Sequence, residues 1–169
     1  MAGKIATSLK GKVDAAWSNL TRQVHGMEPH LERAEGPGEW TTREVLCHLL
    51  LPTGANLEAT LKSFAEQNLP LIEIEPGKTY ITDERRKMSL KQLMDGLDGQ
   101  RQQVCAYIDS LPDEDLQERK ARIPLFKGFF GTDEIPLGRY VGAMFDYHWN
   151  DHAGQLAKIR AAAGLPAAS

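Results

Sequence analysis

Apolar side chains recur every three or four residues in four long stretches of the sequence, and this spacing constrains the fold more than any other feature. Residues at such intervals share one side of an α-helix, so each stretch has an apolar face that must be buried against other elements. The stretches cover roughly residues 3–25, 41–66, 89–111 and 136–164. The sequence therefore predicts an all-α protein, a four-helix bundle formed by a single domain over residues 1–169.

Capping and helix-breaking residues define where the second and third helices begin. Thr41-x-x-Glu44 and Ser89-x-x-Gln92 both have the form of a capping box, in which two side chains and two backbone N–H groups bond reciprocally. Pro52 lies inside the second stretch. Because proline lacks the N–H that the helical ladder needs, we expect a kink at this residue.

Two connections between the helices are unusually long. Residues 67–88 join the second and third helices. A helix of about 23 residues is roughly 35 Å long, whereas an extended chain of about 22 residues reaches roughly 70 Å. The linker is therefore long enough to travel the length of the bundle. We therefore expect a crossover, with the second and third helices parallel and the first and fourth antiparallel to them. Residues 113–135 are rich in apolar side chains and are expected to pack over one end of the bundle and shape a pocket. Within these connections, LIEIE (71–75) and IPLFKGFF (123–130) are predicted to be loops or short extended pieces.

Composition and charge exclude several classes of protein. Hydrophobic residues make up 41% and charged residues 25% of the chain, which is typical of a soluble globular protein. The net charge of −3 gives no electrostatic reason to expect nucleic-acid binding, and no apolar run of about 18 residues predicts a membrane span. Cys47 and Cys105 are too few for a disulfide framework, so we expect a cytoplasmic protein.

Two of the five histidines lie four residues apart in the last stretch, HWNDHAGQLAKIR (148–160). His148 and His152 share one helical face and could converge on a metal ion, although a pair of hydrogen-bonded polar side chains is the alternative. His48 lies in VLCHLLL, where apolar neighbours on every side predict burial. A buried imidazole needs partners for both ring nitrogens, and a shared metal ion would supply one of them. Our interpretation is a site for one divalent transition metal, formed by these three histidines, with zinc or nickel as the expected ion.

Other polar and aromatic residues near the histidines receive simpler interpretations. Three of them flank the pair in sequence: Asp146, Asp151 and Gln155. They could orient the imidazoles from outside the site, while the plainer interpretation of each is a surface residue. Cys47 precedes His48, but adjacent helical residues point about 100° apart, so we assign Cys47 to core packing. Trp40 is interpreted as a packing residue and not as a stacking platform. No motif identifies a catalytic residue.

The quoted segments resemble two motifs of the DinB-like superfamily. WTTREVLCHLL (40–50) is similar to the signature Trp-[ST]-x-x-[DE]-x-x-x-His-Leu near the start of the second helix, and HWNDHAGQLAKIR resembles His-x-x-x-His-x-x-Gln-[IL] on the last long helix. Their separation of about 100 residues and the long second connection also fit. The resemblance implies a four-helix bundle with parallel second and third helices, a metal site at His48, His148 and His152, and a homodimer. For the dimer contact the sequence leaves spare apolar residues, namely Leu57, Leu61, Phe64 and the alanine-rich tail.

The resemblance also implies a function. The superfamily includes S-transferases and isomerases that use low-molecular-weight thiols such as bacillithiol or mycothiol, and proteins assigned as metal-dependent hydrolases. We therefore expect a metal-dependent enzyme that transfers a thiol to a small electrophilic substrate, with neither nucleic acid nor membrane as a partner. A metal-dependent hydrolase, a non-catalytic metal- or ligand-binding stress-associated bundle protein, and a bundle with ordinary histidines are the alternatives. Pro52 and the aromatic segment 113–135 depart from the family pattern, which leaves the shape of the pocket open.

Overall fold

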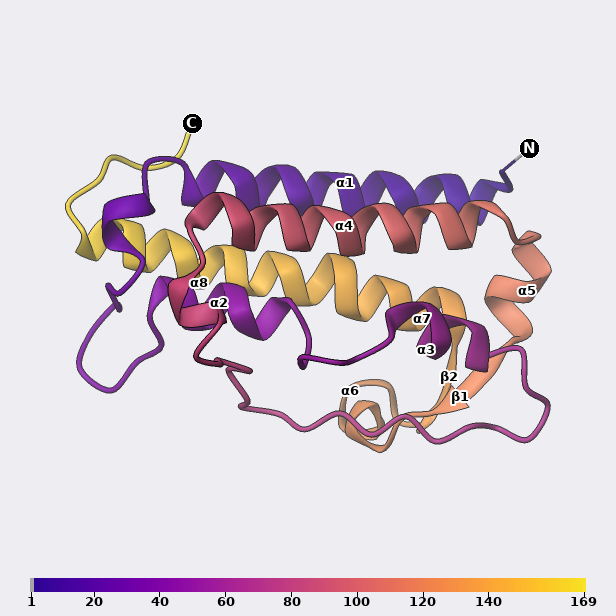
Figure 1. The fold of residues 1–169 in the computed structure, drawn as a ribbon. Helices are drawn as coiled ribbons and strands as arrows, with labels where there is room; N and C mark the ends of the chain where they lie inside the picture. Colours follow the sequence, from indigo (N-terminus) through magenta and orange to yellow (C-terminus); the bar gives the residue numbers. More distant parts are fainter. Residues whose placement is uncertain (1) are drawn as a thin grey trace.

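The computed structural model describes residues 2–169, and four long helical segments lie side by side in it (Figure 1). This confirms the predicted four-helix bundle. None of the described helices has both the length and the apolar character that a membrane span requires. The segments are α1 (Lys4–Val24), α2 (Thr42–Leu49) continued by α3 (Leu57–Ser63), α4 (Leu90–Asp109), and α7 (Leu137–Gly142) continued by a π-helical turn (Ala143–Tyr147) and α8 (His148–Ala162).

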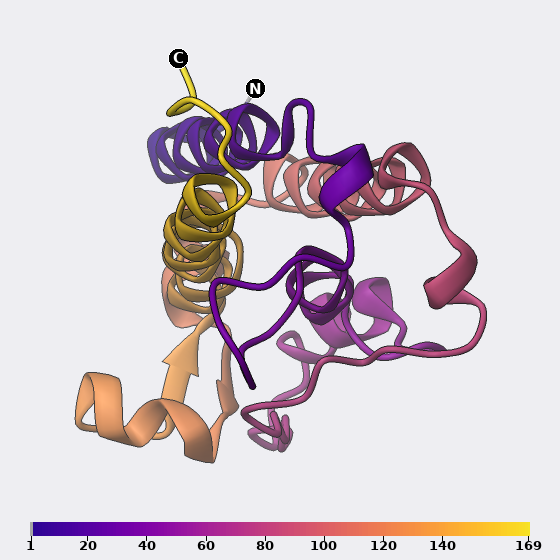
Figure 2. The ribbon, with the colours of Figure 1, turned by 90° about the vertical axis from the view of Figure 1, so that its left-hand side faces the viewer.

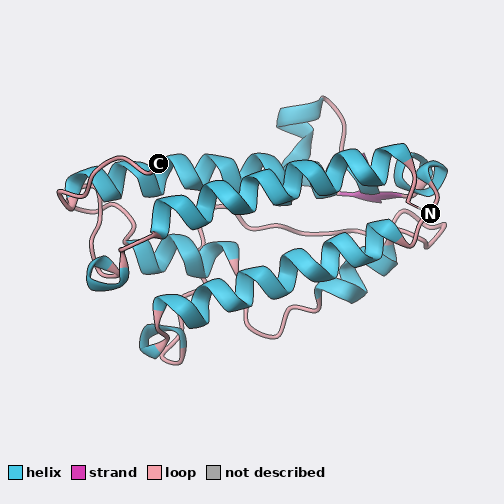
Figure 3. Cartoon of the chain, turned by 90° about the horizontal axis from the view of Figure 1, so that it is seen from above, coloured by secondary structure: helices cyan, strands magenta, loops and turns pink. Residues whose placement is uncertain are grey.

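The predicted crossover between the second and third helical segments is confirmed. α2 and α4 run in the same direction, and α1 and α8 run in the opposite one (Figure 1). After α3, residues 64–88 return along the whole bundle before α4 begins, with a single 3-10 turn at Arg85–Lys87. The view from above shows the long helices running in roughly the same direction, with one long loop running lengthwise beside them (Figure 3).

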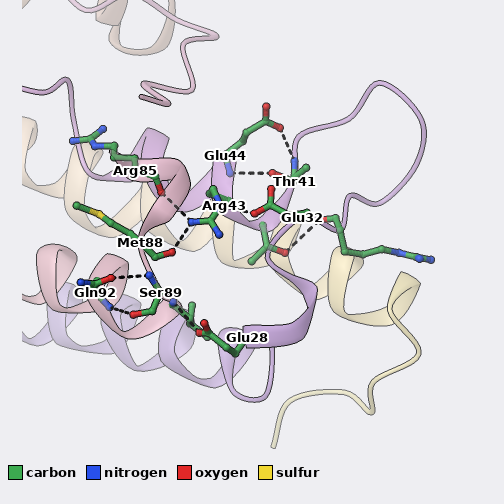
Figure 4. Close-up of polar contacts among 12 residues, drawn as sticks. Glu28, Glu32, Thr41, Arg43, Glu44, Arg85, Met88, Ser89 and Gln92 are labelled. Atoms are coloured by element: carbon green, nitrogen blue, oxygen red, sulfur yellow. Dashed lines mark hydrogen bonds and ion pairs between the residues drawn. The ribbon is translucent and has the colours of Figure 1, made fainter. Parts of the chain in front are cut away.

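The starts of α2 and α4 are fixed by the capping boxes that the sequence predicted. Thr41 Oγ1 accepts from the Glu44 N–H at 3.2 Å, and the Glu44 carboxylate accepts from the Thr41 N–H at 2.8 Å. Ser89 and Gln92 repeat the arrangement at 3.1 and 2.8 Å, and both boxes are visible in Figure 4. Each box satisfies two N–H groups that a helix start would otherwise leave without partners.

The prediction of one kinked second helix was wrong, because the helix is interrupted. α2 ends at Leu49, and Leu51 adopts a positive φ of 65°, which turns the chain out of the helix immediately before Pro52. A residue that precedes proline is sterically disfavoured in the helical region, so the break falls here. Asn56 then restarts the helix by accepting a hydrogen bond from the Ala59 N–H at 2.9 Å. The break leaves His48 next to the end of α2, beside open space.

Segment 113–135 is more ordered than predicted. It contains α5 (Asp113–Glu118), a 3-10 turn (Pro124–Phe126) and α6 (Lys127–Phe130), and strand β1 (Lys120–Arg122) pairs antiparallel with β2 (Glu134–Pro136). The sequence did not predict this strand pair, in which Ala121 lies opposite Ile135 and both side chains are fully buried. In LIEIE, Leu71 bridges Arg122, so that piece is short and extended as expected. Figure 1 places α5 at one end of the bundle, as predicted, whereas α6 lies beside the middle of its length.

The hydrophobic core lies between the long helices. Seen along the bundle, α1 and α4 form one side, and α8 and α2 form the other (Figure 2). α1 packs against both α4 and α8, and α2 packs against α4 and α8. Leu57, Leu61 and Phe64 are 6%, 0% and 1% exposed, so they belong to this core and are not spare for a dimer contact, contrary to our expectation. The homodimer itself stays a prediction.

Candidate metal centre

The three histidines predicted from the sequence lie together between α2 and α8. His148 Nε2 is 2.9 Å from His48 Nε2 and 3.0 Å from His152 Nε2. The ligand atoms of the three side chains all lie within 4.8 Å of one another. The expectation that these imidazoles converge is confirmed, although His48 is 100 residues away from His148 in the chain.

Helical geometry explains how α8 contributes two of the three. His148 and His152 are one turn apart on the face that looks towards α2, and Trp149 packs into the core, with its ring centroid 5.6 Å from that of Phe145. The π-helical turn Ala143–Tyr147 ends directly before His148. Such a turn has one more residue than an α-helical turn, so it shifts the faces of the helix on either side of it. Single π-helical turns occur frequently at functional sites.

Hydrogen bonds to the outer ring nitrogens fix the tautomers of two histidines. His48 Nδ1 bonds the backbone carbonyl of Lys78, and His152 Nδ1 is 2.8 Å from Gln155 Oε1. Both oxygens only accept hydrogen bonds, so each Nδ1 donates its proton, and the Nε2 of the neutral imidazole then presents a bare lone pair. Gln155 thus orients an imidazole, as the sequence suggested. Asp146 instead accepts from Asn150 at 2.9 Å, and Asp151 is exposed.

The resulting cluster has the chemistry of a cation site. His148 Nε2 faces two lone pairs and can donate a proton to only one of them, so at least one lone pair lacks a partner within the trio. Burial and the two neighbouring histidines lower the pKa of His148 to about 3, and burial lowers the pKa of His48. The imidazoles of His148 and His48 are therefore neutral at pH 7, which is the form that binds metal. Two nitrogens at roughly 2.0–2.1 Å from one ion and about 90–110° apart would be separated by about 2.9–3.4 Å, close to the two spacings that join His148 Nε2 to His48 and His152.

Aromatic side chains hold the imidazoles from both sides. The Trp40 ring lies parallel to that of His152, with centroids 6.2 Å apart and planes 9° apart, and its centroid is 5.0 Å from that of His48. The Tyr80 ring stacks on the His48 imidazole, with ring centroids 5.8 Å apart and planes 7° apart. Trp40 packs against the core, as we interpreted it, but it also stacks on His152, which our interpretation had excluded. Tyr80 was missed, since it lies in a linker with no periodic pattern. Trp40 could have been found, because it begins the motif that contains His48.

The trio lines a pocket of about 980 Å³. Apolar side chains form most of its wall, and segment 113–135 contributes four of them, as expected: Leu125, Phe126, Phe129 and Phe130. Among the described residues, neither serine nor cysteine lines the pocket. Cys47 is fully buried in the core, as predicted, and the Thr60 hydroxyl donates to the Asn56 carbonyl at 3.1 Å. The described pocket wall thus offers three imidazoles but no serine or cysteine nucleophile.

Known structures share this fold. YfiT from Bacillus subtilis, described as "a probable metal-dependent hydrolase with an unusual four-helix bundle topology", is 17% identical, with a TM-score of 0.74 over 98% of this chain and 92% of YfiT. An uncharacterised protein from Clostridium difficile 630 is 12% identical, with a TM-score of 0.64 over 95% of this chain and 98% of that one. An uncharacterised protein from Escherichia coli UTI89 is 14% identical, with a TM-score of 0.63 over 98% of both chains. No curated protein matches the sequence.

The family is shown by the sequence itself. The model of the DinB superfamily matches residues 12–156, a span that includes α2, the crossover and all three clustered histidines. The resemblance that the two histidine motifs indicated is thereby confirmed. This chain belongs to the DinB superfamily.

Proposed function

We propose that His48, His148 and His152 hold one divalent transition metal ion, zinc or nickel, and that the protein is an enzyme that transfers a low-molecular-weight thiol to a small electrophile. The observation that carries this proposal is the convergence of three Nε2 atoms on the wall of an apolar pocket. Neutral imidazole suits both metals, and three protein ligands leave coordination positions open, as in catalytic sites.

Each part of the site has a role in this proposal. A bound divalent ion with three neutral ligands lowers the pKa of a thiol or water and so supplies a nucleophile at neutral pH. The Lys78 carbonyl and the Gln155 side chain keep two Nε2 atoms unprotonated and aimed inward. Trp40 and Tyr80 restrict the rings from outside, and the apolar wall excludes water from the reacting groups.

The size of the pocket favours a thiol over water as the nucleophile, because a bound metal ion would lower the pKa of either one. The volume of about 980 Å³ is near the upper end for small-molecule sites, so it has room for a thiol and an acceptor together.

The reaction balances without another reagent. The thiol proton leaves to solvent, and the sulfur forms a bond to the electrophilic carbon. The bond from that carbon to its leaving group breaks, and the leaving group departs with the electron pair. In this proposal the nucleophile enters with the ligand, because neither serine nor cysteine lines the described pocket wall.

Metal analysis followed by a turnover screen tests the proposal. Protein purified without an affinity tag should contain close to one zinc or nickel per chain by elemental analysis, and His148→Ala should contain far less. The metal-loaded protein should accelerate the reaction of at least one small thiol with a haloalkyl electrophile such as monochlorobimane, and the variant should not. Turnover of activated esters without any thiol would instead support a hydrolase, the description given to YfiT. Stoichiometric metal with no turnover of either kind would support a non-catalytic metal-binding protein.

A further inference from the structure

The crossover reaches the metal centre through residues 78–85, which we call the strap. The Lys78 carbonyl accepts the hydrogen bond from His48 Nδ1, and the Tyr80 ring stacks on the same imidazole. Both contacts fall on His48, the ligand that comes from α2. The orientation of His48 therefore depends on a segment that follows it by about 30 residues and lies outside the helices of the bundle.

The strap has little structure of its own to hold these contacts. Residues 78–82 have no regular secondary structure, and Tyr80 has a φ of 54°, in the left-handed region that a tyrosine rarely adopts. Such a conformation persists only when the surroundings enforce it. The strap must therefore be held in place by contacts from outside residues 78–82.

Arg85 provides that hold. Its Nη1 donates to the Tyr80 carbonyl at 3.0 Å and to the Cys47 carbonyl at 3.2 Å. One guanidinium thus joins the residue stacked on His48 to the residue that immediately precedes His48 in α2. A planar, permanently charged group suits this role, because its several donors have a fixed geometry.

The backbone of Arg85 is itself anchored to α2 (Figure 4). The Arg43 guanidinium donates to the Arg85 carbonyl at 2.9 Å and to the Met88 carbonyl at 2.6 Å, and its Nε bonds Glu32. Arg43 is only 7% exposed, so these bonds lie away from bulk water. The end of the strap is therefore fixed to α2, and the Arg85 side chain reaches back from it to the segment beside the ligand.

We infer that Arg85 is a positioning residue for the metal centre: by tying the Tyr80 and Cys47 carbonyls together, it keeps the Lys78 carbonyl and the Tyr80 ring on His48 and so aims His48 Nε2 at the site. This inference rests on the proposed metal function. Loss of a group that orients a metal ligand costs about 10–100-fold in metal affinity. Arg85 acts one step further out, so we expect a loss of about tenfold.

Two readouts on Arg85→Met test the inference, with Arg86→Met as the matched control, because Arg86 is the exposed neighbour in the same 3-10 turn. In the metal-free protein, nitrogen-15 NMR should show a protected His48 Nδ1–H, which should exchange rapidly in Arg85→Met and stay protected in Arg86→Met. Zinc affinity, measured by competition with a chromophoric chelator, should fall about tenfold in Arg85→Met and stay unchanged in Arg86→Met. Arg85→Lys should restore most of both signals, since an ammonium can donate to both carbonyls.

The NMR readout separates this inference from the proposed function. If the parent protein binds no zinc, the metal proposal fails, while the Nδ1–H signal still reports whether Arg85 orients His48. A protected Nδ1–H together with unchanged zinc affinity in Arg85→Met would overturn the positioning role. If Arg85→Met does not fold, Arg85→Gln replaces it, because glutamine fills similar space and cannot span both carbonyls.

Discussion

Gln155 allows the link between an outer hydrogen bond and the metal to be measured. Its Oε1 is 2.8 Å from His152 Nδ1, and both side chains are half-buried. A neutral hydrogen bond contributes about 0.5–1.5 kcal/mol, and removal of an orienting partner typically weakens metal binding about 10–100-fold, or roughly 1.4–2.8 kcal/mol. The two energy ranges overlap near 1.4 kcal/mol, which corresponds to about a tenfold change in affinity. We expect the lower end of the second range, because water can partly replace the half-buried Gln155 side chain. Gln155→Ala should therefore weaken zinc binding about tenfold in a chelator competition assay.

Two further variants make this test specific. Gln155→Glu should bind zinc at least as tightly as the parent, because a carboxylate on Nδ1 makes the opposite ring nitrogen more basic. Gln102→Ala removes an exposed glutamine that bonds Asp98 at 2.7 Å on α4, and it should leave zinc affinity unchanged. If Gln155→Ala and Gln155→Glu both bind zinc like the parent, His152 is not a ligand through Nε2 and the reasoning is refuted.

Three other predictions concern acid stability, aromatic packing and assembly. The pKa of His148 is lowered to about 3 in the folded protein, whereas an unfolded histidine titrates near 6.5. Between these two values the unfolded chain binds one more proton, so the free energy of unfolding of the metal-free protein should fall as the pH drops from about 6.5 towards 3. In urea titrations, His148→Asn should make the free energy of unfolding depend less on pH. Trp40→Ala should lower the free energy of unfolding by at least about 0.5–1.5 kcal/mol, which is the contribution of one aromatic contact. Trp40→Phe should recover part of this loss. Equal stability of the two variants would exclude a role for the stacked ring. We also predict a homodimer, which light scattering should detect at micromolar concentration, and a monomer up to millimolar concentration would contradict it.

The helices and the histidine cluster could be predicted because their signals are local. The apolar stripe of α1, the capping boxes at Thr41 and Ser89, and the four-residue spacing on α8 each follow from neighbouring residues alone. His48 was linked to the α8 pair because an imidazole in an apolar helix needs a partner for each ring nitrogen. The length of the linker permitted the crossover, and the family resemblance also implied it.

What could not be predicted depends on the path of the chain in space. The orienting partner of His48 is the backbone carbonyl of Lys78, and a carbonyl is present at every residue, so the sequence cannot single it out. Tyr80 lies on His48 in an irregular segment of the chain, where Arg85 bonds its carbonyl, and no local pattern in the sequence indicates either contact. The break after α2 was misread because the left-handed φ of Leu51, together with Pro52, ends the helix, whereas the apolar pattern alone continues through it.

A crystal structure of the untagged protein grown with zinc tests the central claim most directly. Anomalous scattering at the zinc edge should show one ion per chain, with His48, His148 and His152 bound through Nε2 at about 2.0–2.2 Å and at least one further position taken by water or ligand. Three imidazoles that diverge, with no zinc among them and their Nε2 atoms more than about 5 Å apart, would contradict the metal centre and the function proposed from it.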